Sequence, residues 1–204
     1  MAETIRLIIF DLCGVVFHCE EEPFFRYFAK EHNCNEAEVE EIFSLHIKKA
    51  ELGEISAVMA VENFLKHFNV KASSIDMLKK LSSFKEINSD MVNLLKKLKA
   101  MHKYKLAYLT NSSIQLMELS ERRLPIKQHF DFGIISEEIK ARKPDKKGFN
   151  LIIRHFDAKP EETIFIDDAA KNLGNAKELG IKTILFTGVK QLIDELRRSG
   201  VELG

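Results

Sequence analysis

From residue 91 onward, short apolar segments alternate with longer stretches of helical periodicity. Apolar strands are expected at 105–109, 132–135, 163–166 and 182–186, and helices near 91–101, 113–123, 146–156, 170–179 and from 189. Another apolar segment, residues 5–10, reads as a strand that is buried on both faces. Strands that alternate with helices predict the α/β class: a Rossmann-like parallel sheet with helices on both faces.

The segment between the first strand and this alternation shows helical periodicity throughout and no strand pattern. Asn35, Ser56 and Ser74 are candidate helix starts, because short polar side chains can cap the first backbone N–H groups of a helix. We therefore expect four amphipathic helices that form a small module. The predicted domains are an α/β core of residues 1–16 and 86–204 and this inserted helical module, residues 17–85.

Charge and hydropathy argue against several classes of partner. The 204 residues include 31 Lys and Arg and 31 Asp and Glu, so no net charge attracts the chain to nucleic acid or to an anionic membrane. No segment approaches the roughly 20 apolar residues of a membrane-spanning helix, and the first residues lack the features of a signal peptide. We expect a cytoplasmic protein without nucleic-acid or membrane partners. The sequence leaves the oligomeric state open.

The chain has three cysteines, Cys13, Cys19 and Cys34. Their number is odd, and their spacing does not match the paired ligands of a zinc site. Disulfides are also rare in the cytosol. We therefore expect three free thiols.

Four polar segments follow expected strands. They are Asp11-Leu12-Cys13-Gly14-Val15, Leu109-Thr110-Asn111-Ser112, Arg142-Lys143-Pro144-Asp145, and Phe165-Ile166-Asp167-Asp168 with Asn172. Ligands of parallel sheets bind at the carboxyl ends of the strands, where the strand order reverses. In this order and spacing, the segments resemble the four motifs of the haloacid dehalogenase superfamily. The helical insert is similar to the cap of the subgroup that includes small-molecule phosphatases and the phosphatase domain of soluble epoxide hydrolases.

The resemblance implies Mg²⁺-dependent hydrolysis of a small phosphorylated metabolite through an aspartyl phosphate. Asp11 would be the nucleophile, a covalent route open to carboxylates. Asp168, Asp11 and the backbone carbonyl of Cys13 would bind the Mg²⁺, and Asp167 would support or share this shell of oxygen ligands. Lys143 would neutralise charge beside the nucleophile. The implied substrate-binding groups are the hydroxyl of Thr110 and the backbone amides near Gly14 and Asn111.

Cys13 departs from the family pattern. Phosphatases of this family usually carry an Asp there, which protonates the leaving oxygen and then activates water. A general acid or base contributes about 10² to 10⁴ in rate, so its loss raises the barrier by roughly 3 to 5 kcal/mol. A thiol with a pKa near 8.5 would be a weak donor and a poor base at neutral pH. We expect weakened turnover, with breakdown of the aspartyl phosphate affected more than its formation.

The same departure leaves other functions open. The chain could be a pseudophosphatase that binds a partner or a phosphorylated ligand without turnover. Haloacid hydrolases of the superfamily also lack the second Asp, but they need no metal, which Asp167 and Asp168 argue against. Phosphonate hydrolases keep the metal and use a cap lysine as a Schiff base, a role open to Lys48 or Lys49. Finally, oxidation of Cys13 to a sulfinate would create a group that resembles a carboxylate.

Overall fold

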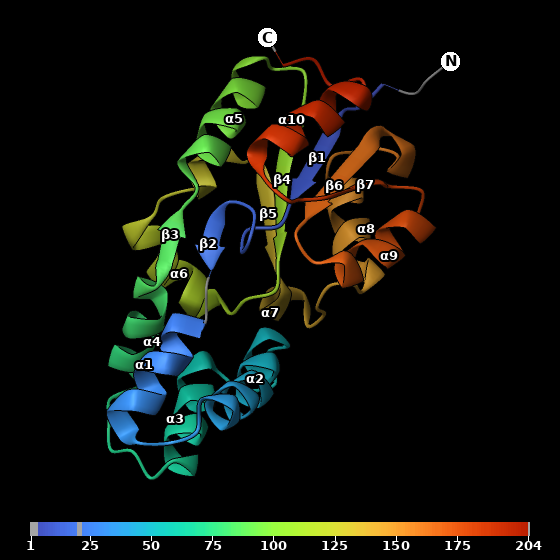
Figure 1. Ribbon diagram of the computed structural model, residues 1–204. Coiled ribbons are helices and arrows are strands. Elements are labelled where there is room, and N and C mark those ends of the chain that lie inside the picture. Colours follow the sequence, from blue (N-terminus) through green and yellow to red (C-terminus); the bar gives the residue numbers. More distant parts are fainter. Residues whose placement is uncertain (1–3, 20–21, 204) are drawn as a thin grey trace.

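The computed structural model describes residues 4–19 and 22–203 and contains a five-stranded parallel sheet (Figure 1). In spatial order the strands are β5 (Phe132–Ile135), β4 (Lys105–Thr110), β1 (Leu7–Phe10), β6 (Thr163–Asp167) and β7 (Lys182–Leu185). All five expected strands are present, which confirms the predicted α/β class. Residues 1–3, 20–21 and 204, which belong to the predicted core and cap ranges, lie outside the described residues.

Different helices cover the two faces of the sheet. Ile8 and Phe10 belong to an apolar cluster that includes residues of α5 (Ser89–Ala100) and α10 (Val189–Arg198). Leu7 and Ile9 belong to a second cluster, which includes residues of α8 (Lys146–His155) and α9 (Ala170–Glu178). Successive side chains of a strand point to opposite faces. The four fully buried residues of β1 therefore require helices on both sides.

Four helices between β1 and β4 pack around a separate apolar cluster, which also includes Leu116, at the end of the molecule opposite the two termini (Figure 1). They are α1 (Glu22–His32), α2 (Glu36–Glu51), α3 (Ala57–His67) and α4 (Ser74–Ser83). Asn35 and Ser56 cap α2 and α3, as predicted. The cap of α4 is Ser73 rather than Ser74, because Ser73 has the extended backbone of an N-cap and its Oγ accepts from the backbone N–H of Asp76.

Two short strands were not expected from the sequence. β2 (Phe17–Cys19) and β3 (Lys85–Ile87) pair antiparallel where the chain leaves the core for the helical cap and where it returns. Each strand has only three residues of mixed polarity, which is too short for an alternating pattern to emerge. The remaining helices are α6 (Ile114–Arg123), the short α7 (Ser136–Ile139) and single 3₁₀ turns at Lys127–His129 and Pro160–Glu162. None of the helices within 4–19 and 22–203 has the length and apolar character needed to cross a bilayer.

Candidate active site

The strand order reverses between β1 and β6. From β1 the chain continues to β4 and β5 on one side, whereas β6 and β7 lie on the other. Asp11 directly follows β1, and Asp167 is the last residue of β6. The backbone N–H of Asp11 donates to the carbonyl of Ile166 over 2.8 Å. The first and fourth polar segments therefore meet at the edge of the sheet where ligands of this architecture bind.

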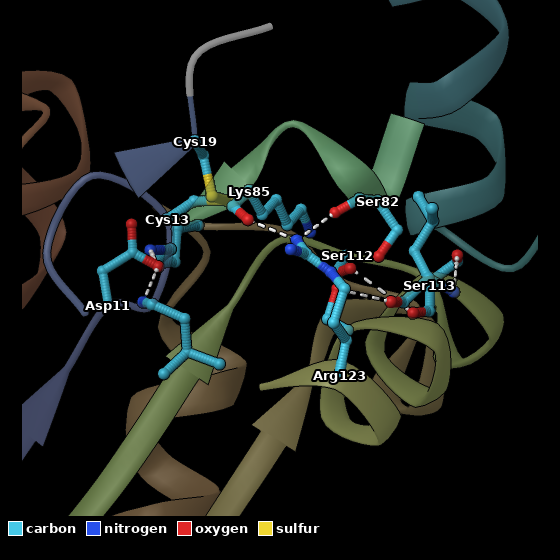
Figure 2. The surroundings of a disulfide bond; sticks show 12 residues. Asp11, Cys13, Cys19, Ser82, Lys85, Ser112, Ser113 and Arg123 are labelled. Carbon is cyan, nitrogen blue, oxygen red and sulfur yellow. Dashed lines mark hydrogen bonds and ion pairs between the residues drawn. A yellow bond between two sulfur atoms is a disulfide. The ribbon is translucent and has the colours of Figure 1, made fainter. Parts of the chain in front are cut away.

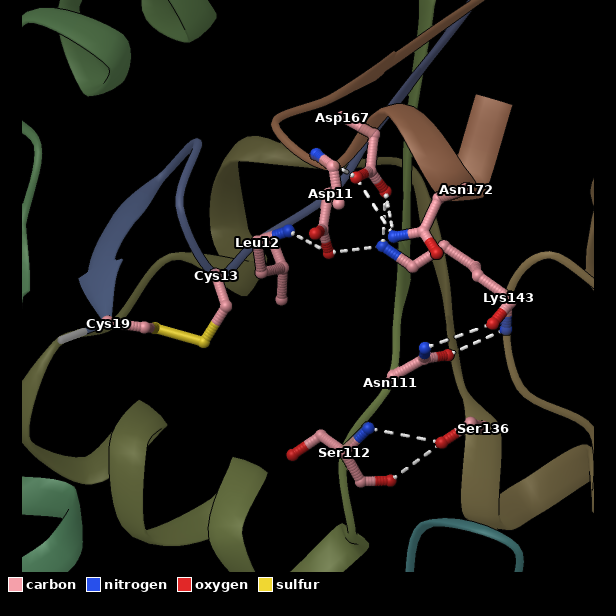
Figure 3. A network of polar contacts seen from close by, with 11 residues as sticks. Asp11, Leu12, Cys13, Cys19, Asn111, Ser112, Ser136, Lys143, Asp167 and Asn172 are labelled. Atoms are coloured by element: carbon pink, nitrogen blue, oxygen red, sulfur yellow. Dashed lines mark hydrogen bonds and ion pairs between the residues drawn. A yellow bond between two sulfur atoms is a disulfide. The ribbon is translucent and has the colours of Figure 1, made fainter. Parts of the chain in front are cut away.

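Lys143 joins these two carboxylates. Its Nζ lies 2.6 Å from Oδ1 of Asp11 and 2.7 Å from Oδ2 of Asp167 (Figure 3). The ammonium group is almost fully buried, so these ion pairs are weakly screened by solvent. The backbone N–H of Leu12 also donates to Oδ1 of Asp11 over 2.7 Å. These contacts hold one carboxylate oxygen of Asp11 in a fixed direction.

Asp167 is completely buried, and both of its oxygens have partners. Asn172 Nδ2 donates to Oδ1 and Oδ2 over 2.9 and 3.1 Å, and the backbone N–H of Ala169 donates to Oδ1 over 2.8 Å. Lys143 Nζ donates to the other side of the same carboxylate, at Oδ2, so Asp167 holds the Lys143 ammonium group in place. This arrangement favours the supporting role among the two roles that the sequence allowed for Asp167.

Three carboxylates gather around one point at this sheet edge. One oxygen from each of Asp11, Asp167 and Asp168 can be chosen so that all three lie within 4.8 Å of one another. Asp168 is exposed and lies against Gly14, which has a φ of +83°, and a Cβ on Gly14 would lie 2.1 Å from Oδ2 of Asp168. A larger residue would strain the backbone at this φ and displace the Asp168 carboxylate, so glycine suits the position. A hard divalent cation such as Mg²⁺ suits these oxygen donors and would offset the repulsion between them.

The second and third polar segments are tied together through their backbones. Asn111 Oδ1 accepts from the backbone N–H of Lys143 over 2.8 Å, and Asn111 Nδ2 donates to the Lys143 carbonyl over 3.4 Å (Figure 3). Thr110, just before Asn111, is buried at the end of β4. Below it, Ser112 exchanges two hydrogen bonds of 3.1 Å with the Ser136 hydroxyl. The amide of Asn111 therefore helps to position the loop that carries Lys143, a contact that sequence alone did not indicate.

A cleft of about 910 Å³ opens above these groups, between the core and the helical cap. Six of the eight predicted site residues line it: Asp11, Cys13, Gly14, Asn111, Lys143 and Asp168. Thr110 lines a smaller cavity of about 50 Å³ instead. Asp167 is fully buried and is not part of the cleft wall. The cap contributes Phe25, Glu40 and Lys48 to the cleft wall, whereas Lys49 is not part of that wall. The structure thus brings the predicted site residues together.

The prediction of three free thiols is wrong for two of the cysteines. Cys13 and Cys19 form a disulfide with a Cα–Cα distance of 5.2 Å, and only Cys34 is free. The cause is a tight turn in which the Leu12 carbonyl accepts from the backbone N–H groups of Val16 and Phe17, so that the chain folds back on itself. A disulfide sulfur carries no proton. In this state Cys13 cannot serve as the weak acid that the sequence suggested.

One contact between cap and site was not expected from the sequence. Glu51, the last residue of α2, places its Oε2 2.5 Å from Nε of Arg142, the neighbour of Lys143. Burial raises the pKa of Glu51, and the Arg142 guanidinium opposes this shift. Glu51 is far from Arg142 in the chain and belongs to no motif, so only the three-dimensional structure identifies the pair.

The charge of Asp11 predicts how stability depends on pH in metal-free protein. Burial and the nearby Asp167 raise the pKa of Asp11 from 3.8 to about 7, although Lys143 opposes the shift. Between these values the folded protein binds more protons at this site than the unfolded chain does, so the stability contribution is present at low pH and is lost as pH rises through about 7. The melting temperature with a chelator present should therefore fall more steeply from pH 4 to pH 7 in the unmodified protein than in Asp11→Asn. Equal slopes in thermal unfolding of the two proteins would contradict this.

Comparisons with known proteins agree with this geometry. The sequence profile of the haloacid dehalogenase-like hydrolases matches residues 5–180. Bifunctional epoxide hydrolase 2 of the pig (Sus scrofa) is 31% identical over 156 residues, which cover 74% of this chain and 26% of the relative. The match to the mouse (Mus musculus) protein of the same name covers 14% of its length, so the chain spans a minor part of these relatives. Other relatives include both phosphatases and haloacid dehalogenases.

Solved structures show the same fold. A HAD-like hydrolase of Porphyromonas gingivalis aligns with a TM-score of 0.80 and 25% identity, covering 96% of this chain and 99% of the other. A HAD family enzyme of Bacteroides thetaiotaomicron, in complex with magnesium and inorganic phosphate, aligns with a TM-score of 0.76 and 26% identity over 88% and 93% of the two chains. Together with the profile match over most of the sequence, these similarities show that the chain belongs to the haloacid dehalogenase-like hydrolases.

Proposed function

We propose that this hydrolase is a Mg²⁺-dependent phosphatase that acts on small phosphorylated metabolites. The observation that carries the proposal is the contact of Lys143 with both Asp11 and Asp167, beside the exposed carboxylate of Asp168. Asp11 and Asp168 line an open cleft, where both could hold a cation, and the buried Asp167 anchors Lys143 behind them. The magnesium and phosphate in the Bacteroides enzyme support the same chemistry in a protein of this fold.

In this proposal Asp11 attacks the phosphorus atom and forms an aspartyl phosphate, and the P–O bond to the substrate breaks. The leaving oxygen departs as an alkoxide or phenolate and takes its proton from water, because Cys13 in the disulfide has none to donate. Lys143 holds one oxygen of Asp11 by its ion pair, so the other oxygen is free to attack. The Thr110 hydroxyl and the backbone amides of Gly14 and Asn111 would bind the phosphoryl oxygens. Asp11 and Asp168 would hold the Mg²⁺ with the Cys13 carbonyl, and the cation would supply positive charge to the transferring group.

The second half-reaction lacks its usual base. Water must attack the aspartyl phosphate, yet the side chain at position 13 is a disulfide sulfur. We therefore infer that formation of the aspartyl phosphate is faster than its hydrolysis. Stopped-flow mixing of the protein with Mg²⁺ and an aryl phosphate should release about one equivalent of phenol in a burst, followed by slow turnover. A linear trace from time zero would contradict this inference.

A phosphate-release screen over phosphorylated metabolites, with Mg²⁺ and with chelator, tests the function itself. We expect Mg²⁺-dependent release from at least one class of phosphomonoester, and no chloride release from 2-chloro acids. Chloride release that persists in chelator would instead identify a haloacid hydrolase. Tight binding of a phosphorylated ligand with neither burst nor turnover would identify a pseudophosphatase.

Lys48 supports a second candidate, phosphonate hydrolysis. It lies in the wall of the cleft that contains Asp11, as a cap lysine must if it is to form a Schiff base with a carbonyl substrate. Borohydride in the presence of an aldehyde-bearing phosphonate would then trap a covalent adduct on Lys48, detectable by peptide mass spectrometry. Lys49, exposed on the same helix but outside the cleft wall, provides the matched control.

A further inference from the structure

The Cys13–Cys19 disulfide joins two parts of the chain that have different tasks. Cys13 is in the loop that follows the nucleophile Asp11, whereas Cys19 is the last residue of β2. β2 belongs to the connection that leads into the cap, and Cys19 pairs there with Lys85 of β3, which belongs to the returning connection (Figure 2). The bond therefore fixes the site loop directly to the pair of strands that carries the cap.

This disulfide is accessible from the cleft. Both cysteines are only partly buried, and both line the cleft of about 910 Å³ as well as the smaller cavity of about 50 Å³. Thiol–disulfide exchange requires that an attacking thiolate can reach one of the sulfur atoms. Lys143, at the base of the same cleft, is by contrast almost fully buried. The bond thus lies where a small dithiol that enters the cleft can reach it.

We propose that Cys13 and Cys19 form a reversible redox site that controls the movement of the cap relative to the loop of Asp11. In the oxidised state, the S–S bond closes a loop of sequence separation six and holds β2 against the site. In the reduced state, only non-covalent contacts hold the connection, such as the hydrogen bond from Gly14 N–H to the Phe17 carbonyl and the pairing of β2 with β3. Water must enter the cleft to hydrolyse the aspartyl phosphate, which is the slow step of the proposed reaction. A cap that opens more freely admits that water, so the reduced form should be the faster enzyme.

The reaction is a two-electron exchange with an external dithiol. One thiolate of the dithiol attacks a sulfur of the pair, the S–S bond breaks, and a mixed disulfide forms. The second thiol of the dithiol then attacks its own sulfur in the mixed disulfide, and the protein cysteine leaves as a thiolate that takes up a proton. Cys13 and Cys19 end as two thiols, having gained two electrons and two protons, and the dithiol ends as its own disulfide. In the test this reductant is dithiothreitol.

Hydrogen exchange measures the effect on the connection without any assay of activity. In the full-length protein, reduction should increase amide exchange in β2 and β3 by about tenfold, because a short cross-link restricts local opening. Exchange in β1 and β6 should stay unchanged. Alkylation of free thiols followed by mass spectrometry gives the redox state of each sample. Equal exchange in fully oxidised and fully reduced protein would overturn the proposal.

Variants separate this site from other effects of reductant. Cys19→Ser, and Cys19→Ala as a second version, should show the fast exchange with or without dithiothreitol, whereas Cys34→Ser should respond as the unmodified protein does. The expected effect on rate rests on the proposed phosphatase function: reduction should raise kcat by about tenfold, as in Cys19→Ser. Redox-dependent exchange in a protein with no phosphatase activity would disprove that function but retain the switch. Phosphatase activity with redox-independent exchange would retain the function and disprove the switch.

Discussion

Replacement of Asp11 with Asn is expected to lower phosphatase turnover by about 10⁴-fold or more, because an amide cannot form the acyl phosphate and loss of a nucleophile is among the largest single effects in catalysis. The shape of the side chain is kept, so Lys143 and the backbone N–H of Leu12 retain a neighbour of the same size. The measurement is single-turnover phosphate release with Mg²⁺, together with mass spectrometry of the acid-quenched protein. The phosphorylated peptide should be absent from Asp11→Asn.

A matched control distinguishes chemistry from folding. Asp157 is exposed and has a φ of +47°, which Asn also adopts readily, so Asp157→Asn should keep both turnover and melting temperature. Asp11→Asn should at the same time be no less stable than the unmodified protein at pH 7.5, since it removes a carboxylate whose pKa burial has raised. Residual turnover above one tenth of the original would assign the nucleophile elsewhere.

The second prediction with a large effect is an increase in turnover. Cys13→Asp should raise steady-state turnover by about 10² to 10⁴, because a carboxylate two residues after the nucleophile restores a general acid and base. The burst should disappear in the same variant, since hydrolysis of the aspartyl phosphate would then keep pace with its formation. Stopped-flow and steady-state assays on the same substrate measure both changes.

Cys13→Asp also breaks the disulfide, so its control is Cys19→Ser, which breaks the bond without adding a carboxylate. The expected gain from Cys19→Ser is about tenfold and is attributed to freer movement of the cap. The gain from Cys13→Asp should exceed it by at least another order of magnitude. Equal gains in both variants would show that the cross-link, rather than the missing acid and base, limits this enzyme.

Local patterns in the sequence predicted the elements whose signal lies in neighbouring residues, such as a buried strand or the start of a helix. The strand at β1 was recognisable because four consecutive apolar residues need two covered faces, and the caps at Asn35 and Ser56 because polar side chains begin helices. β2 and β3 were missed because their pairing joins residues far apart in the chain. Ser74 was chosen over Ser73 because adjacent serines are equivalent until the backbone conformation is known.

The candidate site could be predicted from motifs, but not the contacts that organise it. The residues at strand ends converge because parallel strands end at one edge of a sheet. Three other contacts depend on tertiary structure: the disulfide, the pairing of Asn111 with the backbone of Lys143, and the ion pair of Glu51 with Arg142. The disulfide was missed because the odd number of cysteines, their spacing and the expected cytoplasmic location all argued for free thiols, whereas a tight turn decides which sulfur atoms meet.

The ion pair between Glu51 and Arg142 limits how this enzyme can be re-engineered. Exchanging the helical insert for that of a relative, in order to import a new substrate preference, would remove Glu51 and leave the Arg142 guanidinium uncompensated beside Lys143, which contacts Asp11. Such a chimera would be impaired even if its new substrate fitted well. Successful grafts onto this scaffold should therefore carry an acidic residue at the end of the second inserted helix, or replace Arg142 in the same step.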